Sequence, residues 1–98
     1  MAKRLVWSAR SRKELFDILS YWDKRIGNRK YSKKLYAEIR RKMQSVLKFN
    51  DIGKATSRKD IRKVVIKDYL LFYKVEKSTV EIISVWDNRR NPEDLKLN

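Results

Sequence analysis

Hydrophobic positions recur at two different spacings along this chain, and the change of spacing divides it into two halves. In the first half, two segments carry apolar residues three or four positions apart, which is the spacing of one face of an α-helix. The first segment contains Leu15, Ile18, Leu19, Trp22 and Ile26, and the second contains Leu35, Tyr36, Ile39, Met43, Val46 and Leu47. The pattern therefore predicts two amphipathic helices that form a hairpin.

The residues at the ends of these segments indicate where the helices begin and end. Ser8 or Ser11 can cap the first helix, and Ser11 with Glu14 has the spacing of a capping box. Gly27 offers a stop because glycine readily adopts the left-handed conformation that ends many helices. The second helix is predicted to begin near Arg29.

The remaining apolar runs are short and typical of strands. Residues 4–7 form one run before the first helix, and the other runs are 61–66, 69–75 and 79–87. The last three are joined by connections so short that neighbouring strands must be antiparallel. Residues 49–60 lose the periodicity and are predicted to be a loop. The predicted fold class is α+β: an N-terminal strand, a helix hairpin and a three-stranded antiparallel meander, with the helices on one face of the sheet, in one domain spanning residues 1–98.

Composition excludes several classes of protein. The chain has 98 residues, of which 42% are hydrophobic, and this is enough for one small core. It has no cysteine and no histidine, so a disulfide framework, thiolate chemistry and the commonest metal ligand are all missing. We therefore predict no metal and no cofactor. The apolar run at residues 4–7 is too short for a signal peptide, and no run approaches the roughly 20 apolar residues that span a bilayer. The sequence predicts a cytoplasmic protein without a membrane partner.

The charge of the chain indicates what it binds. Lysine and arginine number 26 against 12 acidic residues, which gives a net charge of +14 at pH 7. A surface of this charge favours nucleic acid or an acidic protein as the partner. Lys54 and Lys59, in the predicted loop, are candidates for contact with a target, although loop lysines are more often only solvated.

The strongest candidate for a binding site lies at the end of the last apolar run, where Arg89 and Arg90 follow residues 79–87. Because a strand so apolar must lie within a sheet, the two guanidiniums are predicted to be held at a rigid sheet edge. Arginines held in this way suit the binding of a phosphate or a carboxylate.

Arg62 is predicted to join this pair. Residues 62 and 63 are both basic and alternate along a strand, so one of them points away from the helices. We expect this residue to be Arg62, with its guanidinium beside those of Arg89 and Arg90. The alternative is a structural salt bridge from Arg62 to an aspartate. The aspartates considered for this bridge are Asp60, Asp68 and Asp87.

These features together resemble the RelE/ParE superfamily of bacterial toxins. The resemblance rests on the order of elements, the Trp7-Ser8 step from strand to helix, Ile61-Arg62-Lys63-Val64, Leu70-Leu71-Phe72-Tyr73-Lys74-Val75 and above all the run from Ile82 to Pro92. It covers nearly the whole chain. It implies the toxin component of a type II toxin–antitoxin module, which arrests bacterial growth when its antitoxin is degraded. The implied partner is a cognate acidic antitoxin that wraps the helix hairpin, and the residues proposed for that contact are Leu15, Leu19 and Trp22.

The superfamily divides by target, and the residues leave the choice open. RelE-like members are ribosome-dependent mRNA endonucleases, whereas ParE-like members resemble them in fold but inhibit DNA gyrase. A nuclease without a metal needs a proton donor and acceptor beside its cations. Nuclease members usually place a Tyr or His near the C-terminus, and this chain has neither after Arg90. The absence of such a residue slightly favours gyrase as the target. No catalytic residue is assigned. The alternative is a metal-independent endoribonuclease that acts on ribosome-bound mRNA. A non-toxic module that binds nucleic acid is a further alternative. Tyr73 and Trp86 could stack on bases, but strand aromatics more often lie in a core.

Overall fold

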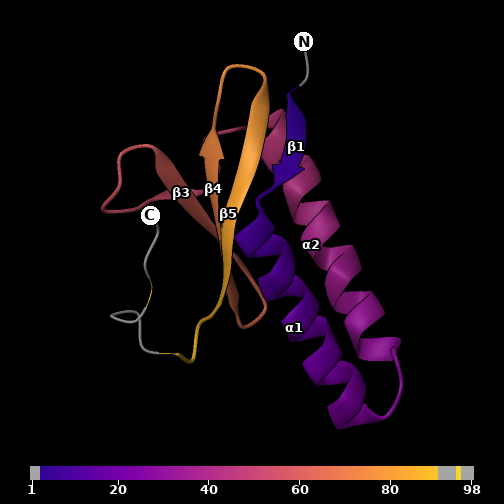
Figure 1. Cartoon of the computed structure of the whole chain (residues 1–98). Coiled ribbons are helices and arrows are strands. Elements are labelled where there is room, and N and C mark those ends of the chain that lie inside the picture. The colour runs from indigo at the N-terminus through magenta and orange to yellow at the C-terminus, as the bar shows by residue number, and fades with distance from the viewer. Residues whose placement is uncertain (1–2, 91–94, 96–98) are drawn as a thin grey trace.

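The computed structural model describes residues 3–90 and 95. It contains one five-stranded sheet that two helices cover on one side (Figure 1). The elements in chain order are β1 (Arg4–Trp7), α1 (Ala9–Ile26), α2 (Lys30–Lys48), β2 (Lys54–Ala55), β3 (Ile61–Ile66), β4 (Tyr69–Val75) and β5 (Thr79–Asp87). The strand order in the sheet is β1-β5-β4-β3-β2. β1 runs parallel to β5, and the other neighbours are antiparallel.

The predicted fold class is confirmed, including the position of the helix hairpin on one face of the sheet. The three strands of the meander have the predicted bounds. The short strand β2 is the element that the sequence did not predict. It pairs Lys54 with Lys63 and Ala55 with Arg62, and two residues are too few to show the alternation by which a strand is recognised.

The ends of α1 confirm the predicted stop at Gly27 and the cap at Ser8, one of the two serines proposed, and correct one prediction. Gly27 ends the helix with φ 85°, and its N–H donates to the Asp23 carbonyl over 2.9 Å. At the other end Ser8 is the N-cap, and its hydroxyl accepts from the Ser11 N–H over 3.0 Å. The predicted capping box between Ser11 and Glu14 is therefore wrong, because Ser11 already lies inside the helix and Glu14 binds elsewhere.

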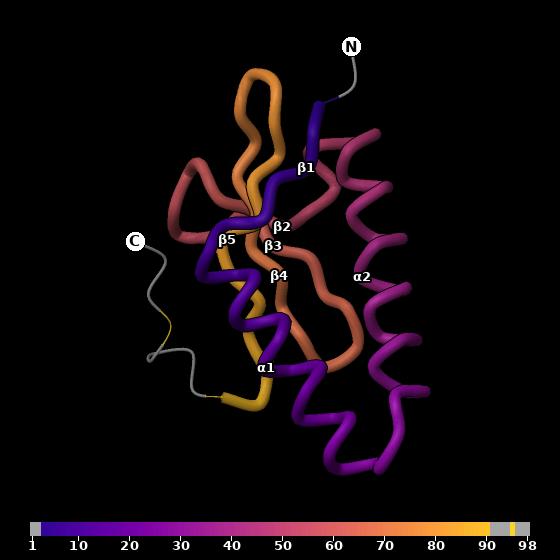
Figure 2. The backbone as a smooth tube through the Cα atoms, turned by 45° about the vertical axis from the view of Figure 1, so that its right-hand side comes forward, coloured from indigo at the N-terminus to yellow at the C-terminus, as the bar shows by residue number. Residues whose placement is uncertain are grey.

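Glu14 fastens α1 to β5. Its carboxylate oxygen Oε1 accepts hydrogen bonds from the Ser84 hydroxyl at 2.9 Å and from the Val85 N–H at 3.0 Å. Here the register between β4 and β5 shifts, so that Ile83 has no partner on β4. Such a β-bulge disturbs the ladder locally and gives a side chain access to its N–H groups. The last part of β5 consequently runs beside α1 (Figure 2).

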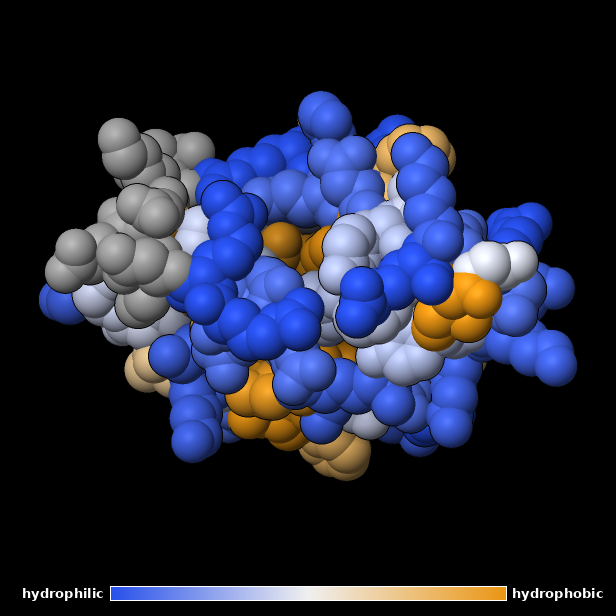
Figure 3. All heavy atoms as spheres, turned by 90° about the horizontal axis from the view of Figure 1, so that it is seen from below, coloured by the Kyte–Doolittle hydropathy of each residue, from blue (hydrophilic) through white to orange (hydrophobic). Residues whose placement is uncertain are grey.

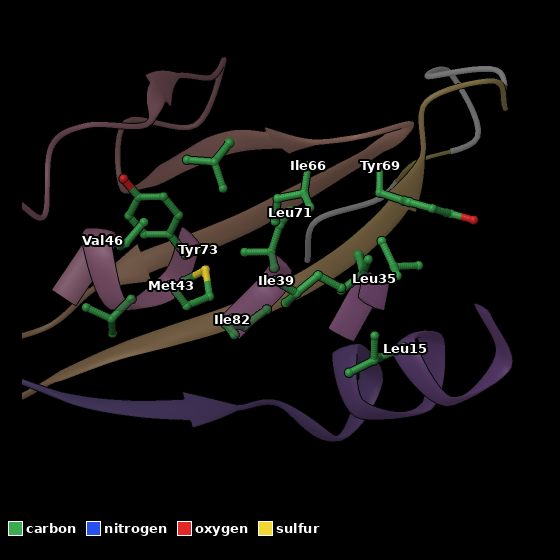
Figure 4. Packing of buried hydrophobic residues seen from close by; sticks show 13 residues of the cluster. Leu15, Leu35, Ile39, Met43, Val46, Ile66, Tyr69, Leu71, Tyr73 and Ile82 are labelled. Carbon is green, nitrogen blue, oxygen red and sulfur yellow. The ribbon is translucent and has the colours of Figure 1, made fainter. Parts of the chain in front are cut away.

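The main core lies between α2 and the centre of the sheet (Figure 4). Four residues of the α2 stripe are almost completely buried, since Leu35, Ile39, Met43 and Val46 are each at most 1% exposed. It packs against sheet residues that alternate along their strands. The fully buried ones are Leu71, Tyr73, Val80 and Ile82.

The opposite side of the sheet carries a second and much smaller cluster. Ile61, Phe72 and Trp86 are buried there, and Leu70, Ile83 and Leu95 pack against them. Within the described residues, no helix contributes to this cluster. The sheet thus has a helix-covered face and a face that we call the helix-free face.

Replacing Glu14 with alanine is expected to lower the free energy of unfolding by about 1–3 kcal/mol, because the Val85 N–H and the Ser84 hydroxyl would lose their shared acceptor. Glu38 is the matched control, since its side chain is 28% exposed and that of Glu14 is 24% exposed. Among the described residues the polar contact of Glu38 is an ion pair with Lys67, so Glu38→Ala should cost less than about 1 kcal/mol. Chemical denaturation of both variants measures the difference, and equal losses would contradict the role given to Glu14.

Candidate functional site at the end of strand β5

Arg89 is held by the carboxylate of Asp87 in a two-point contact. Its Nε and Nη2 atoms lie 3.0 and 2.8 Å from the two carboxylate oxygens, and its backbone N–H also donates to Asp87 at 2.9 Å. These hydrogen bonds hold the pKa of Asp87 below its usual range and raise the pKa of Arg89. The Arg89 side chain is still 59% exposed. The contact therefore fixes the position of the guanidinium and leaves it accessible to a partner.

Arg90 is held by an aromatic ring. The central carbon of its guanidinium lies 4.1 Å from the centroid of the Trp86 ring, which is a cation–π distance. The Arg90 backbone N–H donates to the Asp87 carbonyl over 3.0 Å, closing the turn that follows β5. Both arginines thus lie in the turn directly after β5, as predicted, and β5 is an inner strand of the sheet.

Two hollows share Arg90 in their lining. One, of about 420 Å³, lies between α1 and the end of β5, and its lining includes Tyr21, Tyr69 and Arg89. The other, of about 320 Å³, lies on the helix-free face and has Arg90 on its wall. Seen from below, the molecule presents mostly hydrophilic side chains with apolar patches between them (Figure 3).

The prediction that Arg62 lies beside Arg89 and Arg90 is wrong. Arg62 pairs with Tyr73 across the sheet, and Tyr73 pairs with Ile82, five residues before Asp87. At about 3.3 Å per residue, these five steps place Arg62 near the other end of the sheet. Its Nη1 atom donates to the Gly53 carbonyl at 2.8 Å.

Because side chains along a strand alternate between the two faces of the sheet, Arg62 points to the helix-covered face, as its cross-strand partner Tyr73 does. Its neighbour Lys63 is the residue that points to the helix-free face, where it lines the hollow with Trp86 and Arg90. The sequence correctly required one of the two to face away from the helices, but the choice between them depended on which face the helices would cover.

The two loop lysines occupy different places. Lys54 belongs to β2 and lies directly opposite Lys63, so the two side chains share the helix-free face. Lys59 is exposed in the connection from β2 to β3. Contact of Lys59 with a target stays a prediction.

The hydroxyls of two tyrosines in the sheet form hydrogen bonds within the protein. The Tyr73 hydroxyl donates to the Asn50 carbonyl and accepts from the Gly53 N–H, at 2.8 and 3.0 Å. The Tyr69 hydroxyl accepts from the indole of Trp22 at 2.7 Å. Burial raises the pKa of both tyrosines above the usual value. Both are consequently neutral near pH 7, and Tyr73 has no exposed surface with which to stack on a base.

A known protein family matches nearly the whole chain. The family model of the ParE toxin of type II toxin–antitoxin systems, parDE, matches residues 5–92. This chain belongs to the ParE toxin family. It is thus related to the toxin component of a toxin–antitoxin module, as the sequence resemblance indicated, and the family favours the ParE branch over the alternatives. No curated protein sequence matches it significantly.

A solved structure supports the ParE-family fold independently. The chain is similar to a structure described as the chromosomal ParDE toxin–antitoxin system from P. aeruginosa, with a TM-score of 0.76 and 13% sequence identity. The match covers 88% of this chain and 96% of that chain. At this identity the similarity concerns the fold.

Within the described part of this ParE-family chain, no three His, Cys, Asp or Glu side chains form a group that could hold a metal ion. Neither α1 nor α2 has the length and apolar character that a helix needs to cross a membrane.

The helix hairpin of this ParE-family chain exposes apolar residues other than those predicted for antitoxin binding. Leu15 is only 8% exposed, and Leu19 and Trp22 pack against the main core. Exposed apolar side chains on the hairpin include Phe16, at 69%, and Tyr36, at 40%. A groove of about 420 Å³ also runs along the hairpin. Its lining residues are Leu5, Val6, Trp7, Arg12, Leu15 and Tyr36.

The contact between Asp87 and Arg89 should contribute to stability in a pH-dependent way. Since the pKa of Asp87 is lower in the folded protein, its contribution is complete above the pKa of an unfolded aspartate, about 3.9, and is lost as the pH falls through the folded value. Asp87→Asn should therefore lower the melting temperature at pH 7, and the difference from wild type should shrink below about pH 4. Thermal melts across this range measure it. A difference that is constant with pH would contradict the interpretation.

Proposed function

We propose that this ParE-family toxin arrests bacterial growth by binding DNA gyrase, without chemistry of its own. The observation that carries this proposal is the way Arg89 and Arg90 are held at the end of β5. One guanidinium is bound by a carboxylate and the other lies on an indole, and both are fixed in position before any partner arrives. Arginines placed in this way form a preorganised binding surface, because little rotamer freedom is lost on association.

The surroundings of the tyrosines support inhibition by binding rather than RNA cleavage. Metal-free cleavage of RNA needs groups that donate and accept protons near neutral pH. Tyr69 and Tyr73 are poorly suited to this task, because their hydroxyls are engaged within the fold and burial raises the pKa of each.

We also propose that the cognate antitoxin is acidic and covers the hairpin groove. The net charge of +14 favours an acidic partner. The groove adds apolar contacts from Leu5, Trp7 and Tyr36. Because such contacts are weakly screened by salt, the toxin–antitoxin complex should persist at moderate ionic strength.

The purified toxin is expected to inhibit DNA supercoiling by gyrase. Arg89→Ala and Arg90→Ala should each raise the toxin concentration needed for half-inhibition by about tenfold or more, since each removes a fixed charge from the proposed contact. Lys77→Ala is the matched control. It removes one exposed positive charge from the β4–β5 turn, at the other end of the sheet, and should leave inhibition unchanged.

The same experiment includes Arg62→Ala, which tests the earlier prediction that Arg62 contacts the target. This variant should have a lower melting temperature, because the Gly53 carbonyl loses its donor, and should inhibit gyrase normally once folded. Transcripts should be mapped by primer extension after brief induction in the same cells. Ribosome-dependent cleavage of mRNA with unaffected supercoiling would overturn the proposal in favour of an endonuclease.

Tyr36→Ser is expected to weaken binding of the cognate antitoxin by about tenfold, because an aromatic anchor is lost from the groove, while inhibition of gyrase persists. Phe49→Ser is the control, since Phe49 is more exposed, at 60% against 40%, and does not line the groove. Calorimetric titration of each variant with the antitoxin measures the effect. Equal affinities for the two variants would place the antitoxin elsewhere.

A further inference from the structure

The hollow on the helix-free face has an apolar floor and a wall made of hydrogen-bond donors. Leu70, Phe72 and Trp86 contribute the floor, and Lys63 and Arg90 provide positive charge. No acidic residue is found among the described residues that line it. Neither Lys63 nor the side chain of Arg90 forms an ion pair with a described acidic residue. The site is therefore suited to a negatively charged group.

A buried donor without an acceptor points to the same kind of ligand. Trp86 is only 4% exposed, and its indole Nε1–H finds no hydrogen-bond partner among residues 3–90 and 95. Leaving such a donor unpaired is unfavourable by about 1–3 kcal/mol. The indole N–H itself has almost no accessible surface, so an oxygen atom in the hollow reaches it once the side chains over Trp86, including that of Arg90, shift on binding.

The neighbouring strand adds an independent indication. Lys54 of β2 lies directly opposite Lys63 of β3. Like charges at directly opposed positions destabilise a sheet. The two lysines and Arg90 thus concentrate positive charge around the hollow at a cost to the stability of the free protein, and an anionic partner would relieve this repulsion.

The shape of the site favours a protein segment over a nucleotide. Recognition of unpaired bases depends on aromatic rings that are free to stack. Here Phe72 and Trp86 are each 4% exposed, and Arg90 lies over the Trp86 ring. The accessible apolar surface comes instead from aliphatic Leu70 and Leu95, which are both half-buried. A carboxylate flanked by aliphatic side chains matches this combination.

We infer that the hollow between Lys63, Trp86 and Arg90 binds an acidic, aliphatic segment of the gyrase target, with a carboxylate that accepts from the Trp86 indole and pairs with Lys63. The inference rests on the proposed function. It assigns the hollow to the target because the site shares Arg90 with the proposed contact at the end of β5, whereas the hairpin groove lies on the helix side of the sheet.

Trp86→Phe gives the most specific test, because it removes the indole N–H and keeps an aromatic ring on the floor. The variant should bind intact gyrase about tenfold more weakly, as expected for the loss of one hydrogen bond to a charged group. Its melting temperature should fall, because Trp86 is buried and the smaller ring leaves a cavity, so binding is measured at a temperature at which the variant is folded. If Trp86 had only a structural role, the variant would be less stable but its folded form would bind gyrase as tightly as the wild type does.

Lys63→Gln is the second variant and keeps the inference testable if Trp86→Phe folds poorly. It should weaken gyrase binding by about tenfold while leaving affinity for the cognate antitoxin unchanged. Its melting temperature should stay equal or rise, because the repulsion with Lys54 is relieved. Lys77→Gln, which makes the same chemical change at an exposed position in the β4–β5 turn, should bind gyrase like wild type.

Binding to immobilised intact gyrase distinguishes the outcomes. Wild-type binding with selective loss in Trp86→Phe and Lys63→Gln supports the inference. Wild-type affinity in folded samples of both variants overturns the inference and leaves the proposed function standing. If the wild-type toxin does not bind gyrase, both fail. Loss of binding to a single-stranded RNA oligonucleotide in these variants, with gyrase binding unchanged, would assign the hollow to nucleic acid and also overturn the inference.

Discussion

The burial of the α2 stripe against one face of the sheet is the constraint on which the rest of this structure depends. Leu35, Ile39, Met43 and Val46 leave almost no surface exposed, so their strand partners must all point to that side. Period two then sends every intervening side chain to the opposite face. That face has no helix to cover it among the described residues, and its buried cluster is limited to Ile61, Phe72 and Trp86. Lys63 and Arg90 lie beside this small cluster, and Lys54 faces Lys63.

The same constraint explains why Arg89 and Arg90 take different surroundings although they are neighbours in sequence. β5 is fixed on both sides, by β1 and β4, and Glu14 secures its bulge to α1. The strand therefore ends at a defined place, and the turn at Asp87 directs one arginine to a carboxylate and the other to an indole. The position of β5 thus places the guanidiniums of Arg89 and Arg90 on two adjacent surfaces.

Much of the fold could be predicted because it depends on local patterns. The bounds of β3, β4 and β5 and the stop at Gly27 follow from residue spacing and backbone preference alone. The errors concern contacts between residues distant in sequence. Glu14 fits a local capping pattern, but its carboxylate binds β5, some 70 residues away. The alternation of side chains allowed Arg62 to face away from the helices, but its guanidinium donates to a loop carbonyl on the helix-covered side. Lys63 was passed over because alternation specifies two faces without saying which one the helices cover.

The residues that stabilise the fold and those proposed to bind differ in how completely their polar groups are satisfied. Arg62, Tyr73 and Glu14 each have partners within the chain at 3.0 Å or less. On the helix-free face, by contrast, the Trp86 indole has no acceptor in the described part of the chain, and Lys54 faces Lys63. Natural folds satisfy most buried polar groups, so exceptions that occur together call for a physical explanation. Two unfavourable features next to one hollow, both of which the same kind of ligand would relieve, are more simply explained by binding than by packing.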